Sequence, residues 1–317
     1  MKSNIIEATF LGLAVGDALG VPVEFRSRKE LQANPVKDMR EYGTHNQPKG
    51  TWSDDSSLTF CLAESLCKGY NTNDIAKKFA QWHSATLWNP YGKVFDIGNA
   101  TNRAIYSLKK GTPATLAGGT SEYDNGNGSL MRISPLAFYI KEYPIERRFD
   151  IVKEVSSITH GHIRAIICCF IYIEFIFELL KNSDKENAYK ETQLKVNQFL
   201  NENPICSNKE LNVFHRILKG SIHELEEYQI SSSGYVIDTL EASLWCLLTS
   251  SSYKETVLKA VNLGDDTDTT ATVAGAIAGL YYGMEAIPKE WVEVLARKND
   301  IISLSKKFAK KYGYEKQ

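Results

Sequence analysis

The sequence predicts an all-α fold, and three observations support this prediction. Eight segments repeat their apolar residues with the 3.6-residue period of a helix. Clusters rich in glycine, asparagine and serine separate several of these segments. No run of residues alternates apolar and polar side chains as a half-buried strand does, and there is no strand–helix–strand rhythm.

The predicted helices are distributed along most of the chain. The length of 317 residues leaves one or two domains open, since a domain usually has about 150 residues. Helix-breaking clusters occupy residues 43–50, 89–92, 111–119, 125–128 and 231–234. The eight helical segments are 5–19, 58–67, 73–83, 97–109, 163–180, 236–248, 253–261 and 269–282.

The first and last of these segments carry small residues on one helical face. Glycine inside a helix costs about 1 kcal/mol relative to alanine, so another interaction must offset it. Close approach of two helix backbones in the centre of the molecule would do so, and we prefer this interpretation to direct ligand contact. The small residues are Gly12 and Gly16 in the first segment with Gly20 directly after it, and Ala271, Gly275, Ala278 and Gly279 in the last segment.

The segment 163–180 is the longest apolar stretch of the chain. It contains Arg164, Glu174 and Glu178, which are too many charges for a comfortable bilayer span. We therefore predict a core helix there. The polar stretch 182–208 that follows is expected to form a solvated helix and a linker.

The composition excludes some classes of function. The chain has 37 Lys and Arg against 38 Asp and Glu, a net charge of −1, so it lacks the positive field typical of nucleic-acid binding. Glu7 and Asp17 interrupt the apolar N-terminal stretch, which therefore does not resemble a signal peptide. The six cysteines have no metal-type spacing and indicate reduced thiols. We expect a cytoplasmic monomer without a membrane partner.

The first of two acidic tracts precedes the helical segment 58–67. It reads Gly-Thr-Trp-Ser-Asp-Asp-Ser-Ser over residues 50–57. A helix N-cap would explain one acid, because a carboxylate accepts orphan N–H groups and suits the positive end of the helix dipole. Two adjacent acids between hydroxyl groups exceed what a cap requires.

The second acidic tract precedes the helical segment 269–282. Asp265, Asp266 and Asp268 fall within four residues and repel one another unless water or a cation neutralises them. An exposed acidic loop is the alternative. Both tracts combine hydroxyl and carboxylate oxygens without Cys or His, a set that suits Mg²⁺, Mn²⁺ or Ca²⁺ rather than zinc. The tracts could meet and bind a pair of cations.

Three further segments are candidates for ligand contact or chemistry. Residues 124–129 read Asp-Asn-Gly-Asn-Gly-Ser, a loop that could cradle a diphosphate or form an ordinary turn. Asp96 and His160 each lie at the start of a predicted helix, where a capping role is the alternative to chemistry.

Taken in order, six segments resemble the ADP-ribosylglycohydrolase family. The resemblance implies a single domain over residues 1–317, a compact orthogonal helical bundle, and a cleft with a dinuclear Mg²⁺ or Mn²⁺ centre. It implies hydrolysis of the glycosidic bond that joins ADP-ribose to a protein side chain. The segments are GLAVGDALGVPVEF (12–25), GTWSDDSSLTF (50–60), FDIGNAT (95–101), NGNGSLMRISPLA (125–137), ITHGHIRAI (158–166) and VNLGDDTDTTATVAGAIAGLYYG (261–283).

The resemblance also implies roles for individual residues. Asp265 stands where the family motif varies and receives no role. The implied metal ligands are Ser53, Asp54, Asp55, Asp266, Asp268 and Thr269. The candidates for proton chemistry are Asp55, Asp96 and Glu24. The implied substrate contacts are Gly98, Asn99, Gly126, Asn127, Gly128, Ser129, Met131 and His160.

The chain departs from the family pattern at three positions. Ser56 replaces a threonine and Leu58 a common methionine, and both exchanges look tolerable. Ile163 stands where many members have proline, which bears on His160 as a substrate contact and leaves the metal centre unaffected.

Four functions are compatible with these observations. The favoured one is a hydrolase of ADP-ribosylated arginine, because 95–98 and the Thr-Trp-Ser-Asp-Asp form resemble the nitrogenase-regulating branch of the family. The first alternative hydrolyses serine-linked or other O-linked ADP-ribose. The others are a non-catalytic member that binds ADP-ribose and an unrelated Mg²⁺-dependent phosphohydrolase.

Overall fold

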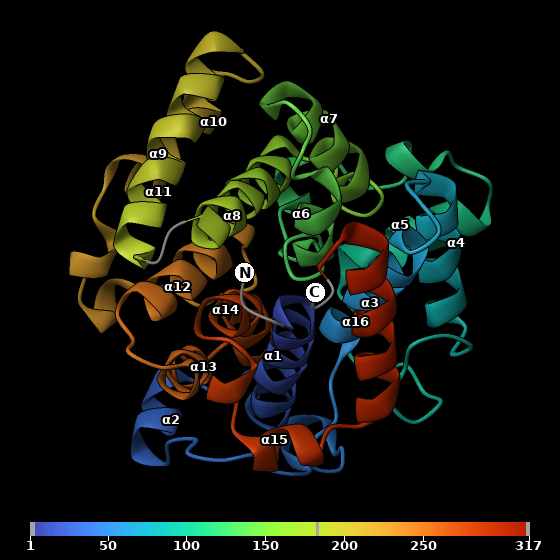
Figure 1. Cartoon of the computed structure of the whole chain (residues 1–317), viewed down its shortest axis with the longest axis vertical. Helices are drawn as coiled ribbons and strands as arrows, with labels where there is room; N and C mark the ends of the chain where they lie inside the picture. Colours follow the sequence, from blue (N-terminus) through green and yellow to red (C-terminus); the bar gives the residue numbers. More distant parts are fainter. Residues whose placement is uncertain (1–3, 182–183, 315–317) are drawn as a thin grey trace.

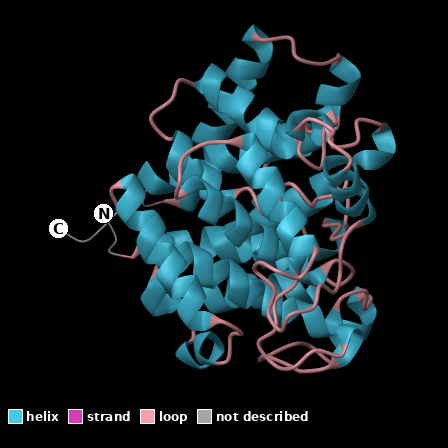
Figure 2. Ribbon diagram, turned by 90° about the vertical axis from the view of Figure 1, so that its right-hand side faces the viewer, coloured by secondary structure: helices cyan, strands magenta, loops and turns pink. Residues whose placement is uncertain are grey.

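The computed structural model describes residues 4–181 and 184–314. Within these ranges the secondary structure consists of α-helices and short 3₁₀ helices, with isolated β-bridges and no strand. Figure 2 shows helices throughout, with many of the connecting loops along one side of the molecule. The all-α prediction is confirmed.

All eight predicted helices are present. Helix α3 begins at Asp54, before the predicted position 58, because the Ser53 side chain accepts a hydrogen bond from the Asp55 amide and caps the helix there. The first acidic tract is therefore part of the helix. The eight helices are α1 Ile5–Gly20, α3 Asp54–Leu66, α4 Thr72–His83, α5 Asn99–Lys109, α8 Ile163–Lys181, α12 Val236–Leu248, α13 Tyr253–Asn262 and α14 Thr267–Tyr282.

Eight further helices were not assigned individually from the sequence. Helix α9 lies in the stretch 182–208, of which 182 and 183 are outside the described residues. The expected helix is present, but it is solvated on one face only, because Tyr189, Val196 and Phe199 are buried where α9 packs against α8. The eight are α2 Arg28–Ala33, α6 Ser134–Ile140, α7 Ile145–Ser156, α9 Lys185–Glu202, α10 Asn208–Asn212, α11 His215–Lys219, α15 Lys289–Glu293 and α16 Lys298–Tyr312.

Helices α1 and α14 lie side by side at the centre of the molecule (Figure 1). Their backbones touch: a Cβ atom at Gly16 would lie 2.1 Å from the carbonyl oxygen of Ala271. A Cβ atom at Gly20 would lie 2.3 Å from the Cα atom of Asp268, so this contact also sets the position of the second acidic tract. The predicted close approach of the two small-residue segments is confirmed.

The segment Ile5–Val23 is long and apolar enough to cross a membrane by length and composition. Of its most apolar 18-residue window, 94% is buried inside the protein. The contact with α14 accounts for much of this burial, so the segment functions here as a core helix.

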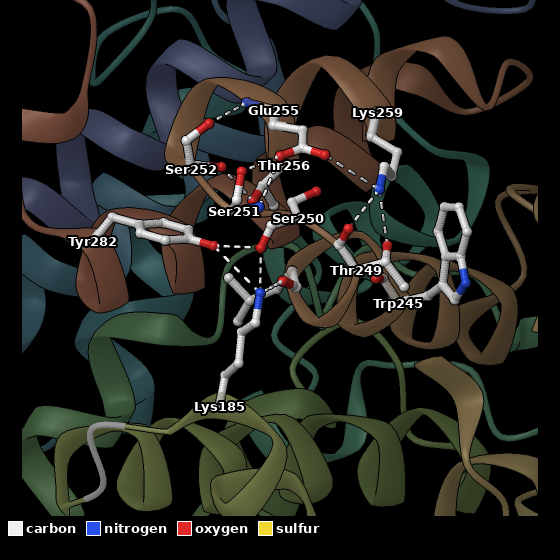
Figure 3. Close-up of polar contacts among 11 residues, drawn as sticks. Lys185, Trp245, Thr249, Ser250, Ser251, Ser252, Glu255, Thr256, Lys259 and Tyr282 are labelled. Atoms are coloured by element: carbon white, nitrogen blue, oxygen red, sulfur yellow. Dashed lines mark hydrogen bonds and ion pairs between the residues drawn. The ribbon is translucent and has the colours of Figure 1, made fainter. Parts of the chain in front are cut away.

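Helix α9 is attached to the core by a lysine at its N-terminus (Figure 3). The Lys185 ammonium donates hydrogen bonds to the carbonyl oxygens of Leu247, at 2.9 Å, and Ser250. The Tyr282 hydroxyl donates to the same Ser250 oxygen at 2.7 Å. Lys185 thus neutralises the negative end of α12 from a distant part of the chain.

Lys185→Met is expected to lower the free energy of unfolding by about 1–2 kcal/mol, because the α12 carbonyl groups lose a charged donor. Thermal or urea unfolding measures the effect. Lys190→Met is the matched control, since Lys190 is exposed on the same helix. Equal stability of the two variants would show that the lysine does not hold α9 in place.

Candidate functional site

A cleft of about 540 Å³ lies where the predicted segments meet. This volume is within the range of about 300–1,000 Å³ typical of small-molecule sites. Its wall is formed by the loop after α1, the starts of α3, α5 and α14, and the glycine-rich loop before α6. The predicted site residues that line it are Glu24, Asp54, Asp96, Gly98, Asn99, Gly126, Asn127, Gly128, Met131, His160, Asp266 and Thr269.

The two acidic tracts meet beside this cleft. The Thr269 hydroxyl donates to the Asp55 carboxylate at 3.4 Å, although the residues are 214 positions apart. One carboxylate oxygen each of Asp17, Asp55 and Asp268 lie within 4.8 Å of one another. Oxygens of Glu24, Asp266 and Asp268 form a second group of the same size, so Asp268 belongs to both.

Each tract is positioned by the start of a helix. In α3, the Ser53 hydroxyl donates to the Asp55 carboxylate at 2.9 Å and accepts from the Asp55 amide at 3.3 Å. In α14, the Asp268 carboxylate accepts from the Thr269 amide at 2.8 Å. Asp54, Asp55 and Asp268 therefore lie in the first turns of two helices, where the helix dipoles favour negative charge.

The acidic side chains at the centre of the site are buried. Burial raises the pKa values of Asp54, Asp55 and Asp268 well above the ordinary range, and the negative charges of neighbouring carboxylates raise them further. Asp265, which received no role, is exposed to solvent. Without a cation, ionising the central carboxylates costs folding free energy.

Several carboxylate oxygens have no partner within the described part of the chain. These buried atoms are Asp55 Oδ1, Asp266 Oδ1 and Asp268 Oδ2. A buried carboxylate oxygen without a hydrogen bond is costly, and a hard divalent cation is the partner that such oxygens prefer. The residues present therefore fit Mg²⁺ or Mn²⁺.

Asp17 is a member of the site that was not identified from the sequence. Its carboxylate accepts hydrogen bonds from the Ser53 amide at 2.9 Å, and from the Ser56 amide and hydroxyl at 3.0 and 2.6 Å. Burial raises the pKa of Asp17 to about 6, against the opposing effect of these bonds. Asp17 therefore attaches the first acidic tract to α1. The sequence signal that could have identified Asp17 is an acidic residue within an apolar helix rich in small residues.

His45 is a second residue that was not identified. Its Nε2 atom contacts the Glu24 carboxylate, and an Asp96 oxygen completes a group within 4.8 Å. The His45 ring lies 6.0 Å from the Phe25 ring and 5.5 Å from the Phe95 ring, measured between centroids. Burial raises the pKa of Glu24 to about 7, and the His45 hydrogen bond opposes this rise. His45 lies in the helix-breaking cluster 43–50, where the sequence showed no other sign of a functional residue.

The glycine-rich loop is tied to the second acidic tract. The Asn127 amide group donates to the Asp266 carboxylate at 2.7 Å and to the Thr239 hydroxyl at 2.8 Å. A Cβ atom at Gly128 would lie 2.7 Å from Cε1 of His160, so the imidazole packs directly on the loop. Burial is the main cause that lowers the pKa of His160 to about 3, and the imidazole is therefore neutral.

Four of the predicted residues do not line the cleft. Ser53, Asp55 and Asp268 lie buried in the group of acidic residues beside it. The Ser129 side chain points into the core, where its oxygen accepts hydrogen bonds from Ser156 at 2.9 Å and Cys169 at 3.5 Å. The side chain of Ser129 is therefore unavailable to a diphosphate, and only its backbone can contribute.

Comparison with known proteins assigns the chain to a family. The model of the ADP-ribosylglycohydrolase family matches residues 3–317. A solved structure described as an ADP-ribosylglycohydrolase-related protein complex superposes with a TM-score of 0.79 at 30% identity and covers 98% of both chains. The family match and the helical fold thus define a glycosidic-bond hydrolase. The chain belongs to the ADP-ribosylglycohydrolase family, as the sequence motifs predicted.

Curated relatives carry related names. ADP-ribosylarginine hydrolase Tri1 of Pseudomonas putida is 33% identical over 305 residues, which is 94% of this chain and 76% of the relative. ADP-ribosyl-[dinitrogen reductase] glycohydrolase of Rhodospirillum rubrum is 29% identical over 91% of this chain and 89% of the relative. ADP-ribosylhydrolase ARH3 of Mus musculus is 25% identical over 76% of this chain and 72% of the relative.

Proposed function

We propose that this protein is a metal-dependent hydrolase that cleaves the bond between ADP-ribose and a modified arginine side chain. One observation carries the proposal: buried carboxylate oxygens that have no partner among the described residues converge from two distant tracts beside a cleft of ligand size. Membership of the family and the names of the relatives support the reaction class.

Two divalent cations, Mg²⁺ or Mn²⁺, are the proposed cofactors. When bound, such ions supply a Lewis acid for the ribose hydroxyls and lower the pKa of a bound water. Their ligands would be hydroxyl and carboxylate oxygens of the two tracts. The proposed ligands are Ser53, Asp54, Asp55, Asp266, Asp268 and Thr269.

The chain supplies the proton acceptors and the binding surfaces. Hydrolysis at the anomeric carbon of the ribose passes through an oxocarbenium-like transition state, which nearby carboxylates stabilise. Asp55 or Asp96 accepts the proton of the attacking water, and Glu24 lies beside Asp96 at the cleft wall. The neutral His160 lies against the glycine-rich loop, where it can contact the ribose or adenosine without repelling a cation.

Arginine is the proposed side chain for two reasons. The relatives named for ADP-ribosylarginine and for dinitrogen reductase match more than nine-tenths of this chain. In addition, Glu24 and Asp96 place carboxylates at the cleft wall beside the exposed Phe25 ring, and a guanidinium group binds carboxylates and stacks on aromatic rings.

The test compares two matched substrates. We expect release of ADP-ribose from an arginine-ADP-ribosylated protein in the presence of Mg²⁺ or Mn²⁺, and loss of release after chelation. A serine-ADP-ribosylated protein at the same concentration is the comparison. Release from the serine-linked substrate alone would overturn the arginine assignment. Binding of ADP-ribose without turnover would indicate a non-catalytic member, and phosphate release without glycosidic cleavage a phosphohydrolase.

A further inference from the structure

A single arginine lies completely buried beneath the glycine-rich loop. Arg132 is 0% exposed, and its guanidinium lies 4.9 Å from the centre of the Phe79 ring. It donates hydrogen bonds to the carbonyl oxygens of Gly128 and of Val155, the latter at 3.2 Å. Its Nε atom has no partner within the residues that the structure describes.

Arg132 differs from two other largely buried arginines of the chain in lacking an acidic partner. Arg148 forms two hydrogen bonds of 2.7 Å with Glu174. Arg164 binds Glu210 in the same bidentate manner, at 2.7 and 3.0 Å. No described carboxylate forms an ion pair with Arg132, and its hydrogen-bond acceptors are two backbone carbonyl groups. A buried cation of this kind is costly to folding unless an anion arrives from elsewhere.

The charge of Arg132 acts on groups that face the cleft. It contributes to the lowered pKa of His160, second to burial. Burial lowers the pKa of the Arg132 guanidinium to about 10, and electrostatic interactions with Cys169 and, more weakly, with Asp54 oppose this shift. His160 and Asp54 both line the cleft, so the charge of Arg132 is felt there across the loop.

Arg132 also sets the orientation of one peptide group in the loop. The carbonyl oxygen of Gly128 points inward to the guanidinium. The described chain has no cis peptide bond, and in a trans peptide the N–H group points opposite to the carbonyl group. The amide N–H of Ser129 therefore points away from Arg132. This orientation gives the Ser129 backbone a donor for an anion, which its buried side chain cannot provide.

We propose that Arg132 is a positioning residue and buried counter-charge for the diphosphate of the ligand. It turns the Gly128–Ser129 peptide so that the Ser129 amide faces away from the guanidinium, and it supplies a positive charge behind that amide. The inference rests on the proposed function, because the diphosphate belongs to ADP-ribose. The diphosphate would be the anionic partner that none of the described residues provides for this guanidinium.

The test compares the affinities of the protein for two related ligands, one that carries a negative charge and one that is neutral. ADP-ribose and adenosine share the adenosine group, and only ADP-ribose carries the diphosphate. Their dissociation constants are measured by calorimetry with Mg²⁺-loaded protein for the wild type, Arg132→Gln, Arg132→Met and Arg132→Lys. We expect Gln and Met to weaken ADP-ribose binding by about tenfold while adenosine binding stays within about twofold, and Lys to retain most of the discrimination.

Arg103→Gln is the matched control for a surface charge. Arg103 lines the same cleft but is exposed and paired with Asp124 at 2.7 Å. Raising the salt concentration should diminish the effect of Arg103→Gln and leave that of Arg132→Gln nearly unchanged, because buried charges are screened less.

An equal loss of affinity for both ligands would show that Arg132 merely maintains the fold, and would overturn the inference. Folding of each variant is judged by circular dichroism and melting temperature. If a folded variant without the charge keeps the wild-type ratio of the ADP-ribose and adenosine dissociation constants, the inference is overturned as well. If neither Arg132→Gln nor Arg132→Met folds, the Arg132→Lys variant decides. Lysine retains the positive charge, so a loss of the preference for ADP-ribose over adenosine in this variant would refute the role of Arg132 as a counter-charge. Failure of the wild type to bind ADP-ribose would instead refute the proposed function and the inference together.

Discussion

Asp268→Asn is expected to reduce ADP-ribose release at least about 1,000-fold, which corresponds to about 4 kcal/mol of transition-state stabilisation. Asp268 is fully buried, belongs to both groups of converging carboxylates, and has one oxygen without a partner in the described structure. Asparagine keeps the shape of the side chain but removes the negative charge that a divalent cation requires. Steady-state release of ADP-ribose measures the loss.

The same substitution should have the opposite effect on the stability of the metal-free protein. The pKa of Asp268 is raised in the fold, so its ionised form is destabilising at neutral pH, and this cost is fully present above the folded-state pKa. The neutral amide of the Asp268→Asn variant carries no such cost, so we expect a higher melting temperature for the variant without metal.

Added Mg²⁺ should reverse this order. At about 100 times its dissociation constant, Mg²⁺ should stabilise the wild type by about 2.7 kcal/mol and the variant much less. Asp265→Asn is the control, because Asp265 is the exposed neighbour in the same tract. A wild-type melting temperature that does not respond to Mg²⁺ or Mn²⁺ would contradict a metal centre at this position.

Gly16→Ala is expected to lower the free energy of unfolding by about 3 kcal/mol or more. The new methyl group would lie 2.1 Å from the Ala271 carbonyl oxygen and 2.6 Å from its carbon, both of which are backbone atoms that cannot rotate away. Helices α1 and α14 would have to separate in the centre of the core. Urea unfolding measures the change, and reduced activity should accompany it because α14 carries the second acidic tract.

Gly98→Ala is the control for a general effect of losing glycine. At Gly98 the atom nearest to an added Cβ is Thr101 Oγ1 at 3.9 Å, and the backbone does not require glycine there. Its stability should stay within about 0.5 kcal/mol of the wild type. A stable Gly16→Ala protein would mean that the two helices tolerate separation, contrary to the packing described above.

The local sequence pattern was sufficient to predict the helices with strong apolar periodicity. It predicted the ends of these helices less well. Helix α14 begins at Thr267 rather than 269 because polar residues in the first turn interrupt the apolar pattern while remaining helical. Helix α16 buries Ile301, Leu304 and Phe308, a spacing that is visible in the sequence. Short helices such as α10 are too brief to show a period at all.

The site could be predicted only where residue chemistry is concentrated in short tracts. Asp54 and Asp266 belong to such tracts, and the structure brings them to one cleft. Asp17 is a single acid on a core helix, and His45 a single histidine in a turn, so tertiary contacts alone reveal their place. The direction of the Ser129 side chain is likewise set by the packing of its loop against α8, which no local pattern encodes.

The pairing of α1 with α14 has a consequence for the order in which the protein is made. Helix α1 is apolar and nearly all buried, but its partner ends at Tyr282. At about 5–20 residues per second, the ribosome needs about 15–55 s to reach the end of α14 after starting α1. During that time α1 is without its native neighbour. We expect the nascent chain to depend on chaperones that cover apolar helices, and the two acidic tracts to meet only after synthesis of α14.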